Sequence, residues 1–537
     1  MTAHAIIPGL TTHLHSTAPR STIGTGRLSF VVILYLITIV LPIHYNVGAV
    51  FMTATRTLLL VTTVPIAIRL FSGQLGRVLP ADVLLLIYVI WAIFTLYLNS
   101  PSQAISFGGS YALEAFGSYL VARCYIRTPE QFLALCWGLL AALIFTLPFA
   151  VYETQTGRAL LTVYLAKLPG IESWGDYYNL LSGRRLGLER SQVIFSHPIH
   201  YGLFSASMIS LALVALKGMT STFKRYLLAA SVCLGVMCSV SSGAILPMML
   251  QFGLMAWAWI FRKNSARWHI LTVLVVIAYV VVDMISNRSP ITVLISRLAL
   301  SSETAWMRIV IFEWGMRNVW ANPYFGIGMN DWVRPDWKSS SMDNFWLVET
   351  VRYGIPGFLL LVSGYFGLVW AAMRRDLGDS GPAWQFRRAW VFMQVGLIIT
   401  LVTVHVWTTA LSYVFFLLGS GAWFATASAT SDTGTAAVAT TSENSERAGP
   451  RYTRFTREPE HPPQANQSRR ARRDHASMHP AHADSPDPAS STARGHGSAI
   501  RGTGQNAHHR QQAATTSRGA NIQGIDSITL VKRPPVL

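Results

Sequence analysis

The stretch YLLAASVCLGVMCSVSSGAILPMMLQFGLMAWAWIF, from Tyr226 to Phe261, contains no charged residue. As one α-helix it would be roughly 54 Å long, whereas the hydrocarbon core of a bilayer is about 30 Å thick. The stretch therefore predicts two membrane spans, which meet at the small residues of 239–243. Runs of this length are typical of integral membrane proteins.

Two other apolar runs are too long for one span and divide in the same way, near residues 42–46 and near His405. The predicted spans are 29–45, 48–68, 81–99, 104–122, 132–152, 197–216, 226–242, 244–261, 269–285, 344–373, 389–405 and 408–426. The predicted fold is therefore an all-α polytopic membrane protein with about 12 transmembrane helices.

The composition supports a membrane location and excludes several functions. Hydrophobic residues make up 51% of the chain and charged residues 13%, and the formal net charge is +18. A positive surface favours anionic partners such as membrane lipid or an anionic substrate. The chain has no Walker loop, HExxH or GxSxG motif, and its four cysteines lack disulfide or zinc spacing. We predict no cofactor, no metal and no nucleic-acid partner.

Basic residues next to the predicted spans fall mainly on one side of the membrane, which the positive-inside rule assigns to the cytoplasm. We predict a cytoplasmic N-terminal segment at 1–28, a transmembrane domain at 29–427, and a cytoplasmic tail at 428–537. The tail is rich in Pro, Ser, Ala, His and Arg and has no apolar periodicity, which predicts disorder.

Two large loops, 153–196 and 286–342, are predicted on the outer face, and both carry several arginines. Long translocated loops tolerate basic residues, so these arginines can simply be solvated. Alternatively, they form a basic pocket above the membrane for an anionic substrate. Charge alone does not decide between the two interpretations.

Arg308 is unusual because of the helix face on which it lies. The stretch RIVIFEWGMRNVW, 308–320, predicts a helix whose apolar face includes Arg308 together with Ile311, Phe312, Gly315 and Val319. Arg317 falls on the opposite face with Glu313, four residues before it, as an ordinary solvated pair. An arginine on an apolar face either snorkels to the lipid surface or points into a pocket.

The stretches RIVIFEWGMRNVWANPYFGIGMNDW (308–332) and DNFWLVETVRYGIPGFLLL (343–361) together resemble the O-antigen ligase and polymerase family. In that family an Arg, here Arg308, opens an outer-face helix. A Pro-aromatic-Gly-x-Gly turn follows, here 323–328. A polar dipeptide, here Asp343 and Asn344, then opens a span that contains Glu and Gly-x-x-Gly. The stretch RRLGLERSQVIFSHPIHYGLF, 184–204, resembles the family's arginine-bearing outer loop.

The resemblance implies a bacterial inner-membrane glycosyltransferase that acts without nucleotide or metal. Its donor would be a glycan on undecaprenyl diphosphate at the periplasmic face. It would polymerise glycan repeats into O-antigen or exopolysaccharide, and its partners would include other assembly proteins such as a flippase and a chain-length regulator. One alternative is a ligase that transfers the glycan to a lipid or protein acceptor. Others are a secondary transporter or flippase, which would place its site mid-membrane, and a scaffold subunit.

Arginine fits a diphosphate because its planar guanidinium bonds two phosphate oxygens and stays charged. We expect Arg308 to stabilise the leaving diphosphate, with Arg185 and Arg190 as further contacts. Arg56 has no local partner in its predicted span, so we also expect it in the substrate cavity. Arg352 lies three residues from Glu349 and either pairs with it or is functional.

Three residues are candidates for proton transfer. His197 and His200 lie at the mouth of a predicted span, where each is either a base for an acceptor hydroxyl or is hydrogen-bonded to the backbone. Asp343 replaces the His that ligases of this family usually show, and it is either the base or a helix N-cap. The tip between the seventh and eighth predicted spans, SVSSGA, also lacks the Arg that the family often shows there. The missing His favours a polymerase over a ligase.

Overall fold

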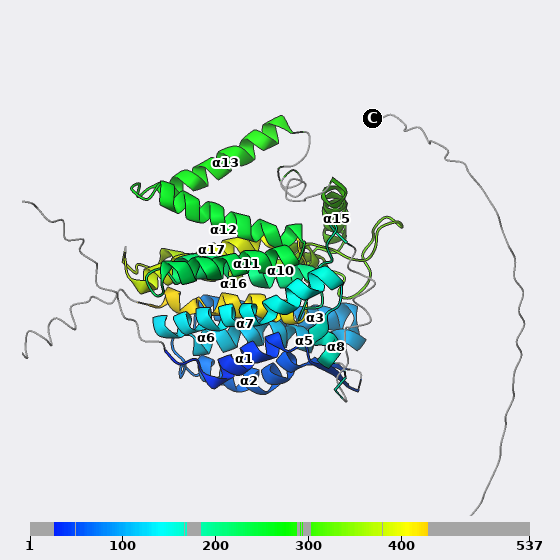
Figure 1. The fold of residues 1–537 in the computed structure, drawn as a ribbon. Helices are drawn as coiled ribbons and strands as arrows, with labels where there is room; N and C mark the ends of the chain where they lie inside the picture. The colour runs from blue at the N-terminus through cyan, green and yellow to red at the C-terminus, as the bar shows by residue number, and fades with distance from the viewer. Residues whose placement is uncertain are drawn as a thin grey trace, which may run out of the picture. The chain divides into compact units, whose positions relative to one another are not determined.

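The computed structural model describes residues 26–427, apart from 49, 166, 169–183, 287–289, 291–292, 294–301 and 379. The predictions for the N-terminal segment before residue 26 and for the tail at 428–537 lie outside these residues, as do parts of both outer loops. The described chain is a bundle of helices with one short hairpin (Figure 1).

The elements follow the apolar runs of the sequence. Their bounds are α1 Phe30–Val40, β1 His44–Val47, β2 Val50–Thr53, α2 Ala54–Phe71, α3 Pro80–Asn99, α4 Pro101–Ala104, α5 Ser106–Ala112, η1 Leu113–Gly117, α6 Ser118–Tyr125, α7 Pro129–Thr156, α8 Leu160–Leu165, α10 Pro198–Ala206, η2 Leu211–Ala215, α11 Thr222–Cys238, α12 Ser242–Ile260, α13 Arg267–Ile285, α15 Ser302–Ala321, α16 Phe345–Arg374, α17 Pro382–Thr400, α18 Thr409–Gly419 and η3 Ala422–Ala425.

Seven helical segments in the described residues are long and apolar enough to cross a membrane. They are 54–71, 80–99, 129–156, 198–215, 242–260, 267–285 and 345–374. Each of the other predicted spans overlaps a helix that is shorter, interrupted or less apolar. The span predicted at 104–122, for example, is interrupted by the π-helical turn η1. The polytopic helical class is thus confirmed, whereas the larger number of spans stays a prediction.

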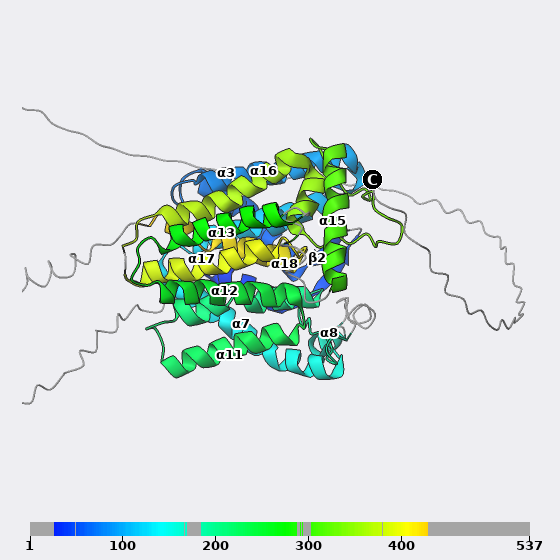
Figure 2. The same ribbon diagram turned by 90° about the horizontal axis from the view of Figure 1, so that it is seen from above.

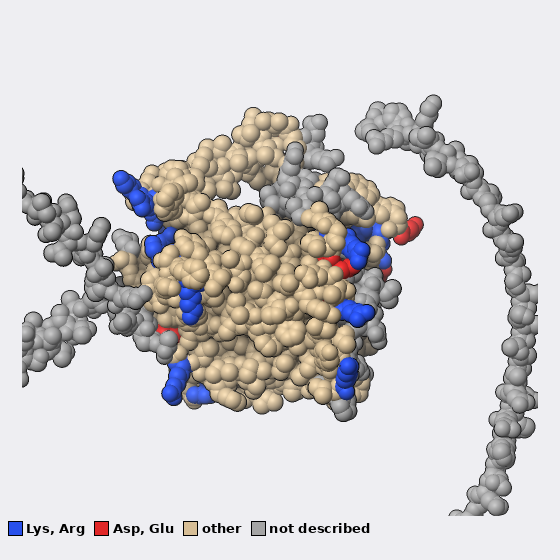
Figure 3. Space-filling model, in the orientation of Figure 1, with Lys and Arg blue, Asp and Glu red and all other residues tan. Residues whose placement is uncertain are grey.

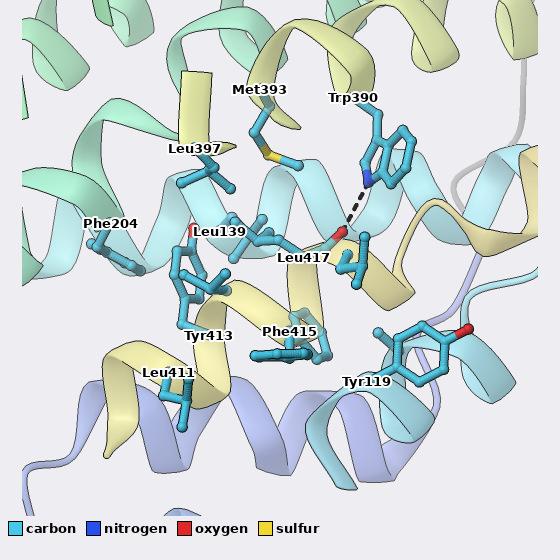
Figure 4. Close-up of a cluster of buried hydrophobic side chains, with 14 of the residues drawn as sticks. Tyr119, Leu139, Phe204, Trp390, Met393, Leu397, Leu411, Tyr413, Phe415 and Leu417 are labelled. Atoms are coloured by element: carbon cyan, nitrogen blue, oxygen red, sulfur yellow. Dashed lines mark hydrogen bonds between the residues drawn. The ribbon is translucent and has the colours of Figure 1, made fainter. Parts of the chain in front are cut away.

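Charge also separates the ends of the bundle from its middle. On the face drawn in Figure 3, charged side chains lie toward the two ends of the helices, and a band of uncharged residues lies between them. A lipid-facing surface needs such a band. Inside the bundle, large apolar side chains fill the space between the helices (Figure 4). The polar indole group of Trp390 is satisfied there, since its N–H donates to the carbonyl of Leu417 at 2.8 Å.

One helical hairpin predicted from the sequence is different in the structure. Residues expected to end one span at 45 and begin the next at 48 instead form the antiparallel strands β1 and β2, with His44 paired to Thr53. Helix α2 therefore begins at Ala54. The pairing of its two strands lets the short β-hairpin satisfy backbone groups within itself.

Helix α15 crosses the other helices at one end of the bundle (Figures 1 and 2). It packs on α16 through a separate apolar cluster, which includes Ile311, Val319 and Leu347. Arg308 is buried, with 7% of its surface exposed, whereas Arg317 is exposed. The predicted orientation of this helix is therefore confirmed.

The glycines of the signature region have a structural role. Gly354 breaks α16 with φ 72° and ψ 176°, and a Cβ at this position would lie 2.1 Å from the carbonyl oxygen of Tyr324. The turn that follows α15 bonds to this break: Ile327 N–H donates to Val351 O at 2.9 Å, and Gly328 N–H donates to Arg352 O at 3.0 Å. The break exposes backbone carbonyl groups of α16 that a continuous helix would bond internally. The turn satisfies these groups and is thereby held against α16.

Candidate functional site

A cavity of about 1110 Å³ lies at the end of the bundle where α15 crosses it. Its walls come from four segments that are far apart in the sequence. They are the arginine loop 185–199, the turn and loop 327–343, the first turns of α16, and the break between α17 and α18 at 404–407. The volume slightly exceeds the range of about 300–1,000 Å³ that is typical of small-molecule sites, so a ligand larger than a diphosphate fits.

Arg190 is the most unusual residue in this cavity. It lines the cavity with only 7% of its surface exposed. Its Nε and Nη2 atoms have no hydrogen-bond partner within the described part of the chain. Burial, with a smaller contribution from the charge of Arg185, lowers the pKa of Arg190 to about 10. A buried guanidinium without a counter-charge is costly, and an anion in the cavity would remove that cost.

The backbone around Arg190 is held by Glu153 in the last turns of α7. The two carboxylate oxygens of Glu153 accept hydrogen bonds from the N–H groups of Gln192 at 3.1 Å and Val193 at 3.0 Å. Ser191 N–H also donates to the carbonyl of Cys238 at the end of α11, at 3.0 Å. Sequence reasoning missed Glu153, although a carboxylate at the end of an apolar run was a signal for it.

Backbone strain occurs in segments near the same cavity, although none of the strained residues lines it. Four non-glycine residues of the described chain have positive φ: Leu186, Val193, Val240 and Thr408. Two of them lie in the arginine loop, one in the tip between α11 and α12, and one in the break between α17 and α18. Such conformations are costly and are typically kept at functional sites, where the surrounding structure enforces them.

Each of the two candidate histidines makes a hydrogen bond to the backbone, which fixes the ring nitrogen that carries the proton in the neutral form. Nδ1 of His197 accepts from the N–H of Ile199 at 3.2 Å, so a neutral His197 carries its proton on Nε2 and is a donor. Nε2 of His200 lies 3.1 Å from the carbonyl oxygen of His405 and donates to it. His197 lines the cavity, whereas His200 is buried behind it. The geometry thus agrees with the backbone-bonded alternative for both.

Asp343 lines the cavity, and its neighbour forms the helix cap. The side chain of Asn344 accepts a hydrogen bond from Leu347 N–H at 3.1 Å, which makes Asn344 the N-cap of α16. The alternative that Asp343 is the N-cap is therefore excluded. Asp343 is accessible from the cavity, but the surrounding walls desolvate it and raise its pKa, while the charges of Lys338 and Arg308 oppose the rise.

Arg308 lies behind the cavity wall, near Asp343 and Arg185. It is not among the lining residues, but both charges act on it. Burial lowers its pKa, the carboxylate of Asp343 opposes this effect, and Arg185 adds to it. The structure thus brings together Arg185, Arg190, Arg308 and Asp343, which come from the two outer loops of the sequence.

Arg56 does not lie with these residues, and the reason for choosing it was wrong. Its Nε donates to Glu114 at 2.7 Å and its Nη1 donates to the carbonyl of Phe51 at 2.6 Å. The partner Glu114 is far away in the sequence and could not be seen there. Because Arg56 is already ion-paired with Glu114, we leave it out of the proposed site.

Arg352 lines the cavity, and no ion pair with Glu349 is formed among the described residues. Glu349 instead accepts hydrogen bonds from Tyr88 and, at 2.8 Å, from Tyr111. The guanidinium of Arg352 lies 5.4 Å from the ring centre of Phe107. The residues that sequence reasoning missed in the cavity also include Trp407 and His405, which lie in the predicted break between two spans.

Comparison with known proteins confirms the resemblance over part of the chain. The model of the family described as O-Antigen ligase matches residues 226–362. The matched region begins with the long apolar run of α11 and α12, contains Arg308 and Asp343, and ends after the break in α16. No curated protein matches the chain. Within the described residues, no group of three His, Cys, Asp or Glu side chains could hold a metal ion.

Proposed function

We propose that this O-antigen ligase-like membrane protein is a glycosyltransferase with a lipid-diphosphate-linked donor. It polymerises glycan repeats carried on undecaprenyl diphosphate at the periplasmic face of the inner membrane. One observation carries the proposal: the buried guanidinium of Arg190 lines the cavity, and two of its nitrogens have no partner within the described residues. A diphosphate supplies acceptors for such a group.

In the proposed reaction, a hydroxyl of the acceptor sugar attacks the anomeric carbon of the donor glycan. Asp343 accepts the hydroxyl proton, since a carboxylate with a raised pKa is a better base than an ordinary one. The bond between the anomeric carbon and the diphosphate oxygen breaks, and the electron pair leaves with the diphosphate. Arg190, Arg185 and Arg308 stabilise the charge that develops there. Nε2–H of His197 is one more donor toward it.

The proposed orientation places the cavity outside the cytoplasm. Two of the segments that form it, the arginine loop and the turn and loop 327–343, lie mostly in the two predicted outer loops. The loops at the other end carry the basic residues expected on the cytoplasmic side. With this orientation, both termini are cytoplasmic. A donor in the outer leaflet would then reach the cavity without leaving the membrane surface.

A ligase remains the second candidate, because the family model that matches the chain is described as O-Antigen ligase. The two activities differ in the acceptor. A polymerase transfers the glycan to another lipid-linked repeat, whereas a ligase transfers it to a different lipid or to a protein. Asp343, where ligases of the family usually have His, favours the polymerase.

Deletion of the gene, followed by gel analysis of surface and secreted glycans, tests the proposal. We expect loss of the long-chain ladder while single repeats still reach their acceptor, and restoration of the ladder by the wild-type gene. Loss of every attached glycan would instead identify a ligase. An unchanged glycan profile would contradict both activities.

A further inference from the structure

Trp407 lies in the break between α17 and α18, where it lines the cavity and is half-buried. Three histidine rings surround it. Their centroids lie 4.1 Å (His200), 5.8 Å (His405) and 6.0 Å (His197) from the centroid of Trp407. The cavity therefore has a large aromatic side chain on one wall and the arginine loop on another.

The segment that carries Trp407 is firmly anchored. Phe345 N–H, at the start of α16, lies 2.9 Å from Leu401 O and 3.1 Å from Val404 O. His200 Nε2 donates to the carbonyl oxygen of His405, two residues before Trp407. A Cβ on Gly243 would lie 2.7 Å from Cγ2 of Val404, so the tip between α11 and α12 packs closely against this segment.

The anchoring holds the chain in a strained conformation immediately after Trp407. Thr408 has φ 49° and ψ −126°, which is unfavourable for a β-branched residue. Such a conformation persists only where the surrounding contacts enforce it, and it is common where a side chain must be aimed at a ligand. The fold therefore fixes the backbone position of Trp407, and the neighbouring histidine rings restrict the position of its ring.

We propose that Trp407 is a stacking platform for a sugar ring of the lipid-linked glycan and helps to select that sugar. An indole ring has a negatively charged face, which attracts the C–H groups that a pyranose exposes on one side. The cavity has space beyond a diphosphate, and Trp407 provides an apolar wall next to the cationic one. The inference rests on the proposed function, because the sugar reaches this wall only if the diphosphate is bound by the arginines.

Binding of two lipids to the purified, detergent-solubilised protein tests the inference. One probe is synthetic undecaprenyl diphosphate, which has no sugar. The other is the lipid-linked glycan extracted from cells that lack this protein. Trp407→Ala should weaken binding of the glycan-bearing lipid about tenfold and change binding of the bare lipid by less than about twofold. Trp407→Phe, which keeps a smaller ring, should lose less.

The control is Trp320→Ala on the outer side of α15, where the side chain is 68% exposed and does not line the cavity. It should bind both lipids as the wild type does. If Trp407→Ala weakens the binding of both lipids equally, or weakens the binding of neither, the role of Trp407 in sugar binding is overturned. If Trp407→Ala fails to fold, equal affinity of Trp407→Phe and the wild type for the glycan-bearing lipid would also overturn it. Failure of the wild type to bind either lipid would instead contradict the proposed function.

Discussion

Replacing Arg308 with Ala should lower the rate of glycan transfer by at least about tenfold, and by more than about a hundredfold if the site is dry, while the protein still accumulates in the membrane. A lost charged hydrogen bond costs roughly 1.5–3 kcal/mol, and each 1.4 kcal/mol is about tenfold in rate. Arg308 is buried beside Asp343 and Arg185, where charge is poorly screened. Arg308→Lys should also fail, because an ammonium keeps the charge but cannot replace the planar guanidinium in this buried position.

The matched control is Arg317→Ala on the same helix. Arg317 is exposed, and its guanidinium lies 4.5 Å from the ring centre of Trp314. An exposed cation–π contact contributes only about 0.5–1 kcal/mol, so transfer should change by less than about fivefold. Both rates are measured with the extracted lipid-linked glycan at equal protein amounts. Equal, mild losses for the two variants would mean that Arg308 only anchors α15 to α16.

Asp343→Asn should abolish transfer while donor binding is retained, because the amide is nearly the same size as the carboxyl group but cannot accept the hydroxyl proton. The cavity walls desolvate Asp343 and raise its pKa, and a base works only when deprotonated. The wild-type rate should therefore fall as pH falls through this raised pKa, at a higher pH than for an ordinary carboxylate. A pH profile of the transfer rate measures this fall, which is the acid limb of the profile.

Asp336→Asn is the control for this experiment, since Asp336 is exposed and does not line the cavity. It should keep both the rate and the acid limb of the profile. If Asp343→Asn retains the rate and the same acid limb, another group takes the proton, and neither the basicity nor the charge of Asp343 is needed for transfer.

Periodicity and hydropathy predicted the large elements correctly because lipid imposes simple rules on them. The divisions at 239–243 and near His405 were right, since an apolar run longer than the membrane must turn. The buried face of α15 followed from the spacing of its apolar residues, with Arg308 among them. The β-hairpin at 44–53 gives no comparable signal, because most of its second strand, Val50–Thr53, is apolar like the run that follows it.

Side-chain partners across the fold could not be predicted. Arg56 appeared to be unpaired because Glu114 lies in another element, and for Arg352 the sequence left open whether it pairs with the nearby Glu349. The sequence left Asp343 as either a base or the helix cap, and the cap lies one residue later, at Asn344. A difference of one residue is below the precision with which sequence locates a helix start. The chain brings these groups together only through tertiary packing.

The most direct test of a diphosphate site is the affinity of the purified protein for undecaprenyl diphosphate, measured for the wild type, Arg190→Ala and Arg184→Ala. Arg184 is six residues earlier, mostly exposed, and paired with Glu189 at 2.6 Å. We expect Arg184→Ala to bind as the wild type does and Arg190→Ala to bind at least about tenfold more weakly, because two nitrogens of the buried Arg190 guanidinium have no partner among the described residues and need an anion. Equal affinities for all three proteins would contradict the account.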